Sequence, residues 1–331
     1  MLEFLRRSLR RPLLGGACVL TLSAVSGPLW AQPAAWPTKP VRLVVGFAPG
    51  GGTDVMARVV AQGLTQALGT TVLVDNKPGA SGNLAAGEVV KAAPDGYTVM
   101  VAPTSVETAN PSLFKANFHP AKDLTPVGSI GVTAMYIVAR PDIAVKNAKE
   151  LVDYGKANPG KLSYASSGAG TPPHLAAELL KMRTGFFATH IPYRGSAPAL
   201  QDVMASQADY VFDPGIAFPH IRSGKVKLLG VASAKRSPFF PETPTLSEQG
   251  IKGAELDIWF GVWVPNGTPP EIVARLNLEL AKVLAQPTLK QRFAELGAEP
   301  AALDQAAFRK LLAEEGRVLT TLIASQKIAV D

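Results

Sequence analysis

Cysteine is almost absent from this sequence. Cys18 is the one cysteine among 331 residues, and it falls within an N-terminal segment that resembles an export signal. Once that segment is removed, the mature chain contains no cysteine. This absence excludes disulfide bonds, thiolate metal sites and a cysteine nucleophile from the mature protein.

Charge is also scarce, because Asp, Glu, Lys and Arg together make up 18% of the residues. The formal net charge is +7, but part of it comes from four arginines near the N-terminus. The other basic residues are scattered, and residues 225–227 and 235–236 form only short pairs. Because binding to nucleic-acid phosphates needs a basic face or stripe, we expect no nucleic-acid partner.

A long hydrophobic run occurs only at the N-terminus, in the pattern of a secretory signal. Residues 1–11 carry four arginines, residues 12–30 carry no charge, and Ala31 provides a small residue for cleavage. We predict cleavage after Ala31 and a periplasmic mature protein. The arginine pair at 10–11 also resembles a twin-arginine signal, so the export route stays open.

Motifs of common hydrolases and metalloenzymes are missing. The sequence has no G-x-S-x-G turn and no H-E-x-x-H. Residues 46–52 lack both the G-x-G-x-x-G spacing of dinucleotide sites and the lysine of a P-loop. Ser167, His174 and Asp213 could be drawn as a triad, but nothing in their spacing requires one. We therefore expect a protein that is not an enzyme and that uses no metal and no cofactor.

Strands and helices alternate along the rest of the chain. Short apolar runs bounded by glycine or proline predict strands, and apolar residues at helical spacing predict helices. In the first part, the expected elements are strands at 41–45, 71–74 and 97–102 and helices at 55–68 and 83–92. This βαβαβ order implies a parallel sheet covered by helices.

The same order returns in the middle of the chain and is followed by further helices. The expected strands are 161–165, 189–193, 210–212, 226–232 and 256–264, and the main expected helices are 174–183, 197–206, 272–284, 288–296 and 305–323. The last three helices need a sheet to pack on, and the first unit offers one. We predict a first lobe of residues 32–131 and 257–331, a second lobe of residues 132–256, and crossovers near 132–138 and 257–264.

Two glycine-rich loops, at residues 46–54 and 166–173, each join a strand to a helix. The first N–H groups of a helix have no partner within the helix, and glycines let a ligand approach them closely. A carboxylate or phosphate satisfies such donors. Asp54 and Thr171 have a second interpretation, since either can simply cap its helix. Both interpretations stay open at this point.

Several stretches resemble the signatures of one receptor family. Residues 46–54 (GFAPGGGTD) and 76–83 (NKPGASGN) are similar to the first two signatures of the Bug-type receptors, which are the periplasmic substrate-binding proteins of tripartite tricarboxylate transporters. Further similar stretches follow in family order at 166–175, 190–195, 212–214 and 234–238. The resemblance covers essentially the whole mature chain.

This resemblance implies an α/β fold of two lobes, the type II-like Venus flytrap of periplasmic binding proteins, which closes on a small organic acid. In the family, two glycine loops hold a carboxylate largely through backbone N–H groups and ordered water. Carried over to this sequence, the first loop supplies Phe47, Ala48, Gly52, Thr53 and Asp54, and the second supplies Ser166, Ser167, Gly168, Gly170 and Thr171.

Four further residues are candidates for the ligand site. His174 is a candidate lining residue, and Thr104 and Ser105 follow a strand end and can add hydroxyl groups. Asp213 also lies at a strand end, where it either favours an amine or hydroxyl group on the ligand or caps the turn before Pro214. The resemblance further implies membrane permease subunits as partners, and we expect the receptor to be a monomer.

Two alternative functions remain open. The same fold can serve as a ligand sensor that presents its closed form to a signalling partner. A hydrolase using Ser167 is the third possibility, and turnover of carboxylate esters would reveal it. The identity of the carboxylate does not follow from the sequence, because side chains outside the glycine loops set it.

Overall fold

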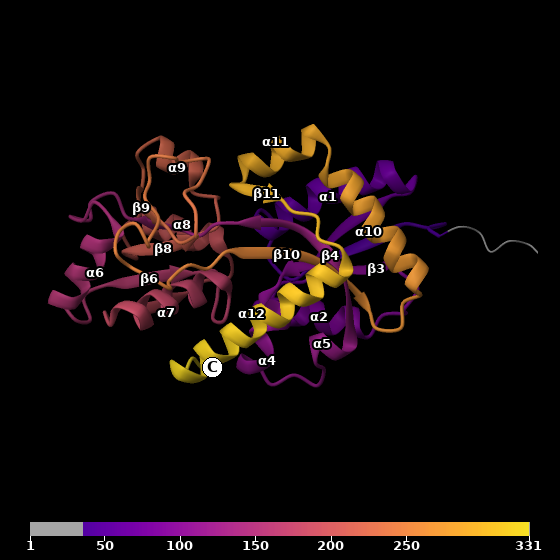
Figure 1. Cartoon of the computed structure of the whole chain (residues 1–331), viewed down its shortest axis with the longest axis horizontal. Coiled ribbons are helices and arrows are strands. Elements are labelled where there is room, and N and C mark those ends of the chain that lie inside the picture. The colour runs from indigo at the N-terminus through magenta and orange to yellow at the C-terminus, as the bar shows by residue number, and fades with distance from the viewer. Residues whose placement is uncertain (1–35, 331) are drawn as a thin grey trace, which may run out of the picture. The chain divides into compact units, whose positions relative to one another are not determined.

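The computed structural model describes residues 36–330 of the chain. The predicted signal peptide, its cleavage at Ala31 and Cys18 lie outside these residues. Within residues 36–330, no helix has the length and apolar character needed to span a membrane. The described part is an α/β structure with two β-sheets (Figure 1).

Six strands form the first sheet, in the order β11 (Ala298–Pro300), β4 (Leu124–Thr133), β10 (Ile258–Pro265), β3 (Thr98–Pro103), β1 (Val41–Val45) and β2 (Val72–Asn76). β1 pairs in parallel with β2 and β3, as the βαβαβ order predicts. β10 runs antiparallel to both β3 and β4. Strands from the C-terminal part of the chain therefore complete a sheet that the N-terminal part begins.

The helix α1 (Gly52–Leu68) shows how the sequence sets the elements around this sheet. Met56, Val60 and Leu64 recur every four residues and are buried in one cluster with the strands. Gly69 ends the helix in the left-handed conformation that glycine adopts most easily. The other helices beside this sheet are η1 (Ala80–Gly82), α2 (Asn83–Val90), α3 (Ser105–Thr108), α4 (Asn110–Leu113), α5 (Pro120–Asp123), α10 (Pro270–Leu284), α11 (Pro287–Glu295) and α12 (Gln305–Ser325).

Five strands form the second sheet, in the order β7 (Thr189–Pro192), β6 (Ser163–Ser166), β8 (Tyr210–Asp213), β5 (Tyr136–Ala139) and β9 (Lys227–Val231). β6 pairs in parallel with β7 and β8, whereas β5 runs antiparallel to β8 and β9. Its helices are α6 (Ala148–Ala157), α7 (Pro172–Thr184), α8 (Ser196–Met204) and α9 (Phe218–Arg222). Each sheet thus has a strand, a glycine loop and a helix in succession.

The chain passes between the two sheets twice. It leaves the first sheet after β4 and enters β5 through residues 134–135, inside the predicted crossover. It leaves the second sheet after β9 and returns through residues 232–257, so the segment predicted as the second crossover is β10 itself. The residue boundaries given for the two lobes stay a prediction.

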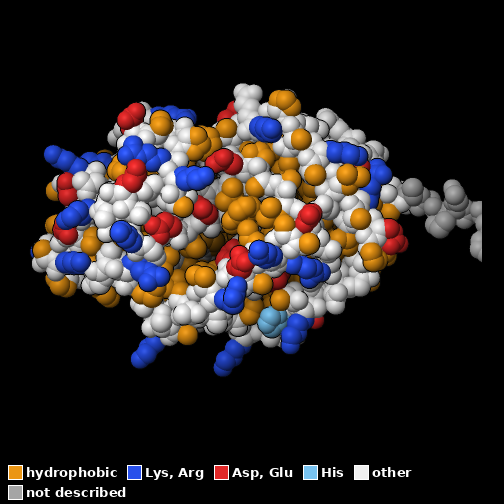
Figure 2. Space-filling view, in the orientation of Figure 1, with side chains coloured by type: hydrophobic (Ala, Val, Ile, Leu, Met, Phe, Trp, Pro, Cys, Tyr) orange, Lys and Arg blue, Asp and Glu red, His pale blue; other side chains and the backbone are white. Residues whose placement is uncertain are grey.

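The C-terminal helix α12 packs against helices of both sheets. Leu319 and Leu322 share a buried cluster with Ala109, just beyond α3, and with Leu175 and Leu179 of α7. Figure 1 shows α12 running from the elements of the first sheet toward α7. The space-filling view shows lysine and arginine side chains spread over that face rather than gathered in one patch (Figure 2).

Candidate ligand-binding cleft

The first glycine loop joins β1 to α1 and is held in shape by Asp54. This residue is 2% exposed, and its carboxylate accepts a hydrogen bond from the Gly50 N–H at 2.9 Å. Arg58 Nε and Asn76 Nδ2 donate to it at 3.0 and 2.8 Å. Burial raises the pKa of Asp54, but these hydrogen bonds outweigh burial and hold the pKa below its ordinary value. The carboxylate is therefore engaged by its own loop and helix and by the end of β2.

The second glycine loop joins β6 to α7 and is braced by its hydroxyl groups. Thr171 Oγ1 donates to the Gly168 carbonyl at 2.7 Å, and Ser167 Oγ donates to Thr171 Oγ1 at 3.0 Å. Thr171 occupies the N-cap position of α7, yet its side chain caps no helical N–H. Gly168 and Gly170 have φ angles of +134° and +75°, which residues other than glycine rarely adopt.

The two glycine loops differ in the donors that their helices offer. α1 begins with Gly52 and Thr53, which both carry an N–H. α7 begins with Pro172 and Pro173, which carry none. The two helix starts look equivalent in sequence, but the first turn of α7 supplies fewer backbone donors for an anion.

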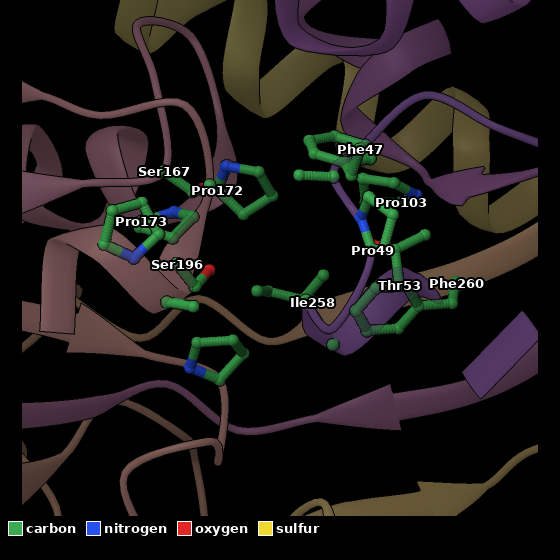
Figure 3. A pocket seen from close by; sticks show the side chains of 17 residues that line it. Phe47, Pro49, Thr53, Pro103, Ser167, Pro172, Pro173, Ser196, Ile258 and Phe260 are labelled. Carbon is green, nitrogen blue, oxygen red and sulfur yellow. The ribbon is translucent and has the colours of Figure 1, made fainter. Parts of the chain in front are cut away.

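A cleft of about 70 Å³ lies between these loops, with walls from elements of both sheets. Figure 3 shows Phe47, Pro49 and Thr53 on one side and Ser167, Pro173 and Ser196 on the other. The full lining is Phe47, Ala48, Pro49, Gly51, Gly52, Thr53, Pro103, Ser167, Pro172, Pro173, Gly195, Ser196, Ala197, Pro198, Pro214, Ile258 and Phe260. Five of the proposed ligand residues are among them, namely Phe47, Ala48, Gly52, Thr53 and Ser167.

A third helix start borders the cleft, and its residues are not among the site residues predicted from the sequence. Gly195, Ser196 and Ala197 line the cleft where α8 begins. Gly195 has a φ of +134° and directly precedes the first residue of α8. A glycine followed by a hydroxyl residue was the available signal, since Gly52-Thr53 and Gly170-Thr171 stand in the same way at the start of the other two helices.

A larger groove of about 530 Å³ adjoins the cleft and shares Phe47, Ala48 and Ser167 with it. Gly168 lines this groove rather than the cleft. Arg194 is its one charged lining residue and is exposed to solvent. A cation thus stands near the cleft, although the two glycine loops themselves contain no arginine or lysine.

Thr104 and Ser105 border a separate small cavity together with Glu315. The Thr104 hydroxyl donates to both carboxylate oxygens of Glu315, at 2.7 and 2.8 Å, and Thr108 donates to one of them at 2.9 Å. Burial raises the pKa of Glu315 to about 7. The hydroxyl of Thr104 is therefore engaged within the protein and not directed into the cleft.

Asp213 is the last residue of β8 and is 1% exposed. Its carboxylate accepts hydrogen bonds from the N–H groups of Gly215 at 2.6 Å and Ala217 at 3.0 Å. Burial raises the pKa of Asp213 to about 6. This geometry matches the turn-capping interpretation, and it is Pro214, the next residue, that lines the cleft.

Four of the predicted site residues lie in or behind the second loop and do not line the cleft, namely Ser166, Gly170, Thr171 and His174. The Gly170 N–H donates to His174 Nδ1 at 2.9 Å, and burial lowers the pKa of His174 to about 4. His174 also lacks a hydrogen bond to Ser167, whose hydroxyl donates to Thr171. Within the described residues, no group of three or more His, Cys, Asp or Glu side chains is placed to hold a metal ion.

Comparison with known proteins shows extensive similarity. Residues 56–328 match the model of the TctC family, described as the tripartite tricarboxylate transporter family receptor. Protein BugT of Bordetella pertussis is 34% identical over 303 residues, which cover 89% of this chain and 91% of BugT. The structure of the periplasmic binding protein BugD has a TM-score of 0.83 and 37% identity, and covers 89% of this chain and all of its own.

A ligand-bound structure is equally similar. MatC from Rhodopseudomonas palustris, solved with bound malate, has a TM-score of 0.82 and 33% identity over 87% of this chain and all of its own. The alignments with BugT and BugD each cover 89% of this chain, and the family match at residues 56–328 includes the second sheet and the second glycine loop. The chain belongs to the receptor family of the tripartite tricarboxylate transporters, with the two-lobed fold of Bug-type periplasmic binding proteins.

Proposed function

We propose that this receptor captures a small organic dicarboxylate in the cleft and delivers it to a membrane permease. The observation that carries the proposal is the position of two helix starts at one cleft. Gly52 and Thr53 begin α1 and Ser196 and Ala197 begin α8, and all four line the same cavity. Helix starts present free N–H groups and partial positive charge, which suit a carboxylate.

The chemistry of the lining supports a carboxylate with a short hydrocarbon chain. None of the lining residues is charged, so a bound anion meets neutral donors only. The hydroxyls of Thr53 and Ser196 add polar groups, whereas Phe47 and Ile258 offer apolar contact for methylene groups. MatC, whose structure contains malate, shows that a related receptor holds a four-carbon acid.

The site residues that we propose are fewer than the sequence suggested. The ligand contacts five of the predicted residues and Ser196 at the start of α8. The five are Phe47, Ala48, Gly52, Thr53 and Ser167. Ser166, Gly168, Gly170, Thr171 and His174 shape the second loop. Asp54, Thr104, Ser105 and Asp213 stabilise the elements behind the cleft.

The proposed event is reversible binding without chemistry. Ser167 is the one hydroxyl nucleophile suggested by the sequence, and its Oγ donates to Thr171 rather than to a base. A serine hydroxyl without a neighbouring base is a weak nucleophile. We also propose that the protein is exported to the periplasm, that its signal peptide is cleaved near Ala31, and that the receptor is a monomer.

A thermal-shift screen of the mature chain tests this function. We expect at least one dicarboxylate of four to six carbons, beginning with malate, to raise the melting temperature, because binding to the folded state alone stabilises it. The matched control is the dimethyl ester of the same acid, which keeps the carbon chain but removes both charges. A shift of equal size with the ester, or no shift with any carboxylate, would contradict the proposal.

A further inference from the structure

A stack of three aromatic rings lies behind the second glycine loop. The rings of His174 and His190 are 4.0 Å apart and nearly parallel, at 8°. Tyr164 stacks on His190 at 4.9 Å and 17°. The three residues come from α7, β7 and β6, so the stack joins three elements of the second sheet beneath one loop.

The two imidazole rings hold both ends of the loop. Gly170 near its end donates its N–H to His174 Nδ1 at 2.9 Å. Ser166 at its beginning shares a hydrogen bond of 2.6 Å between Oγ and His190 Nε2. The same Ser166 Oγ accepts the Gly168 N–H at 3.2 Å. Three residues of the loop are thus tied, directly or through Ser166, to the histidine pair.

These ties add to the hydrogen bonds that Thr171 and Ser167 make within the loop, and they matter because two of the loop residues are glycines. Gly168 and Gly170 have positive φ angles, and glycine has the widest range of backbone conformations and loses the most freedom on ordering. A loop that is ordered only when ligand binds weakens binding, whereas one ordered beforehand does not. Ser167, which lines the cleft, lies between the two tied ends.

The surroundings keep both rings neutral. His174 is 5% exposed, and burial lowers the pKa of His174 to about 4 and that of His190 to about 3. Two further charged groups act on the pair, Lys181 and Glu178 of α7, and these two form an ion pair at 2.7 Å. Since the Gly170 N–H needs an unprotonated Nδ1, the neutral form of His174 carries its proton on Nε2.

We propose that His174 and His190 are positioning residues that set the second glycine loop for ligand: His174 Nδ1 accepts the Gly170 N–H, and His190 Nε2 shares a hydrogen bond with Ser166 Oγ. The affinity part of this inference rests on the proposed function. The claim that the histidines order the loop does not rest on that function, because the order of the loop can be measured without any ligand. Neither histidine is proposed to touch the ligand.

The test compares His174→Asn with His174→Leu. Asparagine places its Oδ1 where histidine places Nδ1, two bonds from Cβ, whereas leucine offers no acceptor. We expect the leucine variant to lose hydrogen-exchange protection at the Gly170 amide and to bind malate about tenfold more weakly. The asparagine variant should restore both. His190→Gln and His190→Leu test the hydrogen bond to Ser166 in the same way, because glutamine keeps a polar group that can reach Ser166 and leucine does not.

The ligand-free and ligand-bound measurements separate the possible failures. Equal protection of Gly170 in the wild type and the folded leucine variant would overturn the inference. So would an asparagine variant that behaves like leucine, because ring packing rather than the acceptor would then set the loop. If malate and other dicarboxylates do not bind the wild type, the proposed function fails, and the exchange measurement still decides the role of His174.

Discussion

At the scale of single residues, glycine serves two different purposes in the two loops. A side chain added at Gly52 would meet no atom within 4 Å, and its φ angle lies in the ordinary range. Gly168, by contrast, has a φ of +134°, where any larger residue strains the backbone. Only the first of these glycines can be replaced without a cost to the fold.

The first prediction follows from the open space beside Gly52. In Gly52→Val the isopropyl group should occupy the cleft at the start of α1, so that affinity for a carboxylate falls at least 100-fold. The free energy of unfolding should change by less than about 1 kcal/mol. Calorimetry and urea unfolding measure the two quantities.

Gln62→Val is the control for this variant, because it places valine on an exposed position of the same helix. Full affinity in Gly52→Val would contradict the model of the cleft. The sequence alone suggests that Gly168→Val is an equivalent test, but its positive φ means that valine there should also destabilise the fold, by about 1–3 kcal/mol.

The second prediction concerns how the stability of the fold changes as the pH falls. Because the folded pKa of His174 is about 4 and the ordinary value is 6.5, the unfolded chain takes up a proton in this interval that the folded chain does not. Stability from this residue is therefore lost as the pH falls from about 6.5 to 4, by up to about 1.4 kcal/mol per pH unit. Asp213 and Glu315, whose pKa values are raised, act in the opposite direction.

The difference between His174→Asn and the wild type reports on the histidine pair, because both proteins keep these carboxyl groups, whereas the lowered pKa of His190 depends in part on His174. We expect urea unfolding to show that the variant gains stability relative to the wild type at each step from pH 7 to pH 4. A difference that does not vary with pH would show that His174 titrates normally in the folded state.

At the scale of elements, a buried acid, Glu315, joins α12 to α3 beside the first sheet. Glu315 accepts hydrogen bonds from Thr104 and Thr108, and its pKa of about 7 compares with an ordinary value of 4.5. The carboxyl group is thus more easily protonated in the folded state. Ionisation of Glu315 costs stability as the pH rises from about 4.5 through 7.

The third prediction is that Glu315→Gln stabilises the protein at alkaline pH. Glutamine can accept the same hydroxyl donors without a buried charge, so the variant should be about 1–3 kcal/mol more stable than the wild type at pH 8. Near pH 4.5 this advantage should disappear, since the wild-type carboxyl is then protonated. Urea unfolding at both pH values measures it, and a lower stability of the variant at pH 8 would refute the assignment.

At the scale of the whole described structure, contacts join the loops of the two sheets beside the cleft. The Ser81 hydroxyl, on η1 of the first sheet, donates to the Ala169 carbonyl in the second glycine loop. Gly170 of the same loop approaches Leu113 at the end of α4. Contacts of this kind favour the arrangement in which both walls face one ligand.

The fourth prediction follows from the Ser81 contact. Ser81→Ala removes one hydrogen bond that exists only when the loops meet, so affinity for a carboxylate should fall about threefold to tenfold. Calorimetry measures this change, and small-angle scattering of the ligand-free variant should show a larger radius of gyration than the wild type. Ser112→Ala, which removes an exposed hydroxyl, is the control, and equal affinities in the two variants would exclude a role for the contact.

Local signals explain why much of this structure could be predicted from sequence. Strand β1 lies where the apolar run predicts it, and α1 ends at Gly69 as expected. α1 begins three residues earlier than predicted, because Gly52 and Thr53 already adopt helical geometry. Apolar spacing and glycine positions act over a few residues, so the order of elements and the two glycine loops follow from sequence alone.

Only the tertiary structure decided which polar groups remain free for a ligand. Asp54 is engaged by Asn76 and Arg58, and Thr104 by Glu315, a residue 211 positions away. The start of α8 lines the same cleft as the start of α1. Nothing in the local sequence of either helix indicates that the two starts lie together. The sequence determined the loops and helix starts because backbone geometry is a local property. Their hydrogen-bond partners were decided by contacts between distant segments, which form only when the chain is folded.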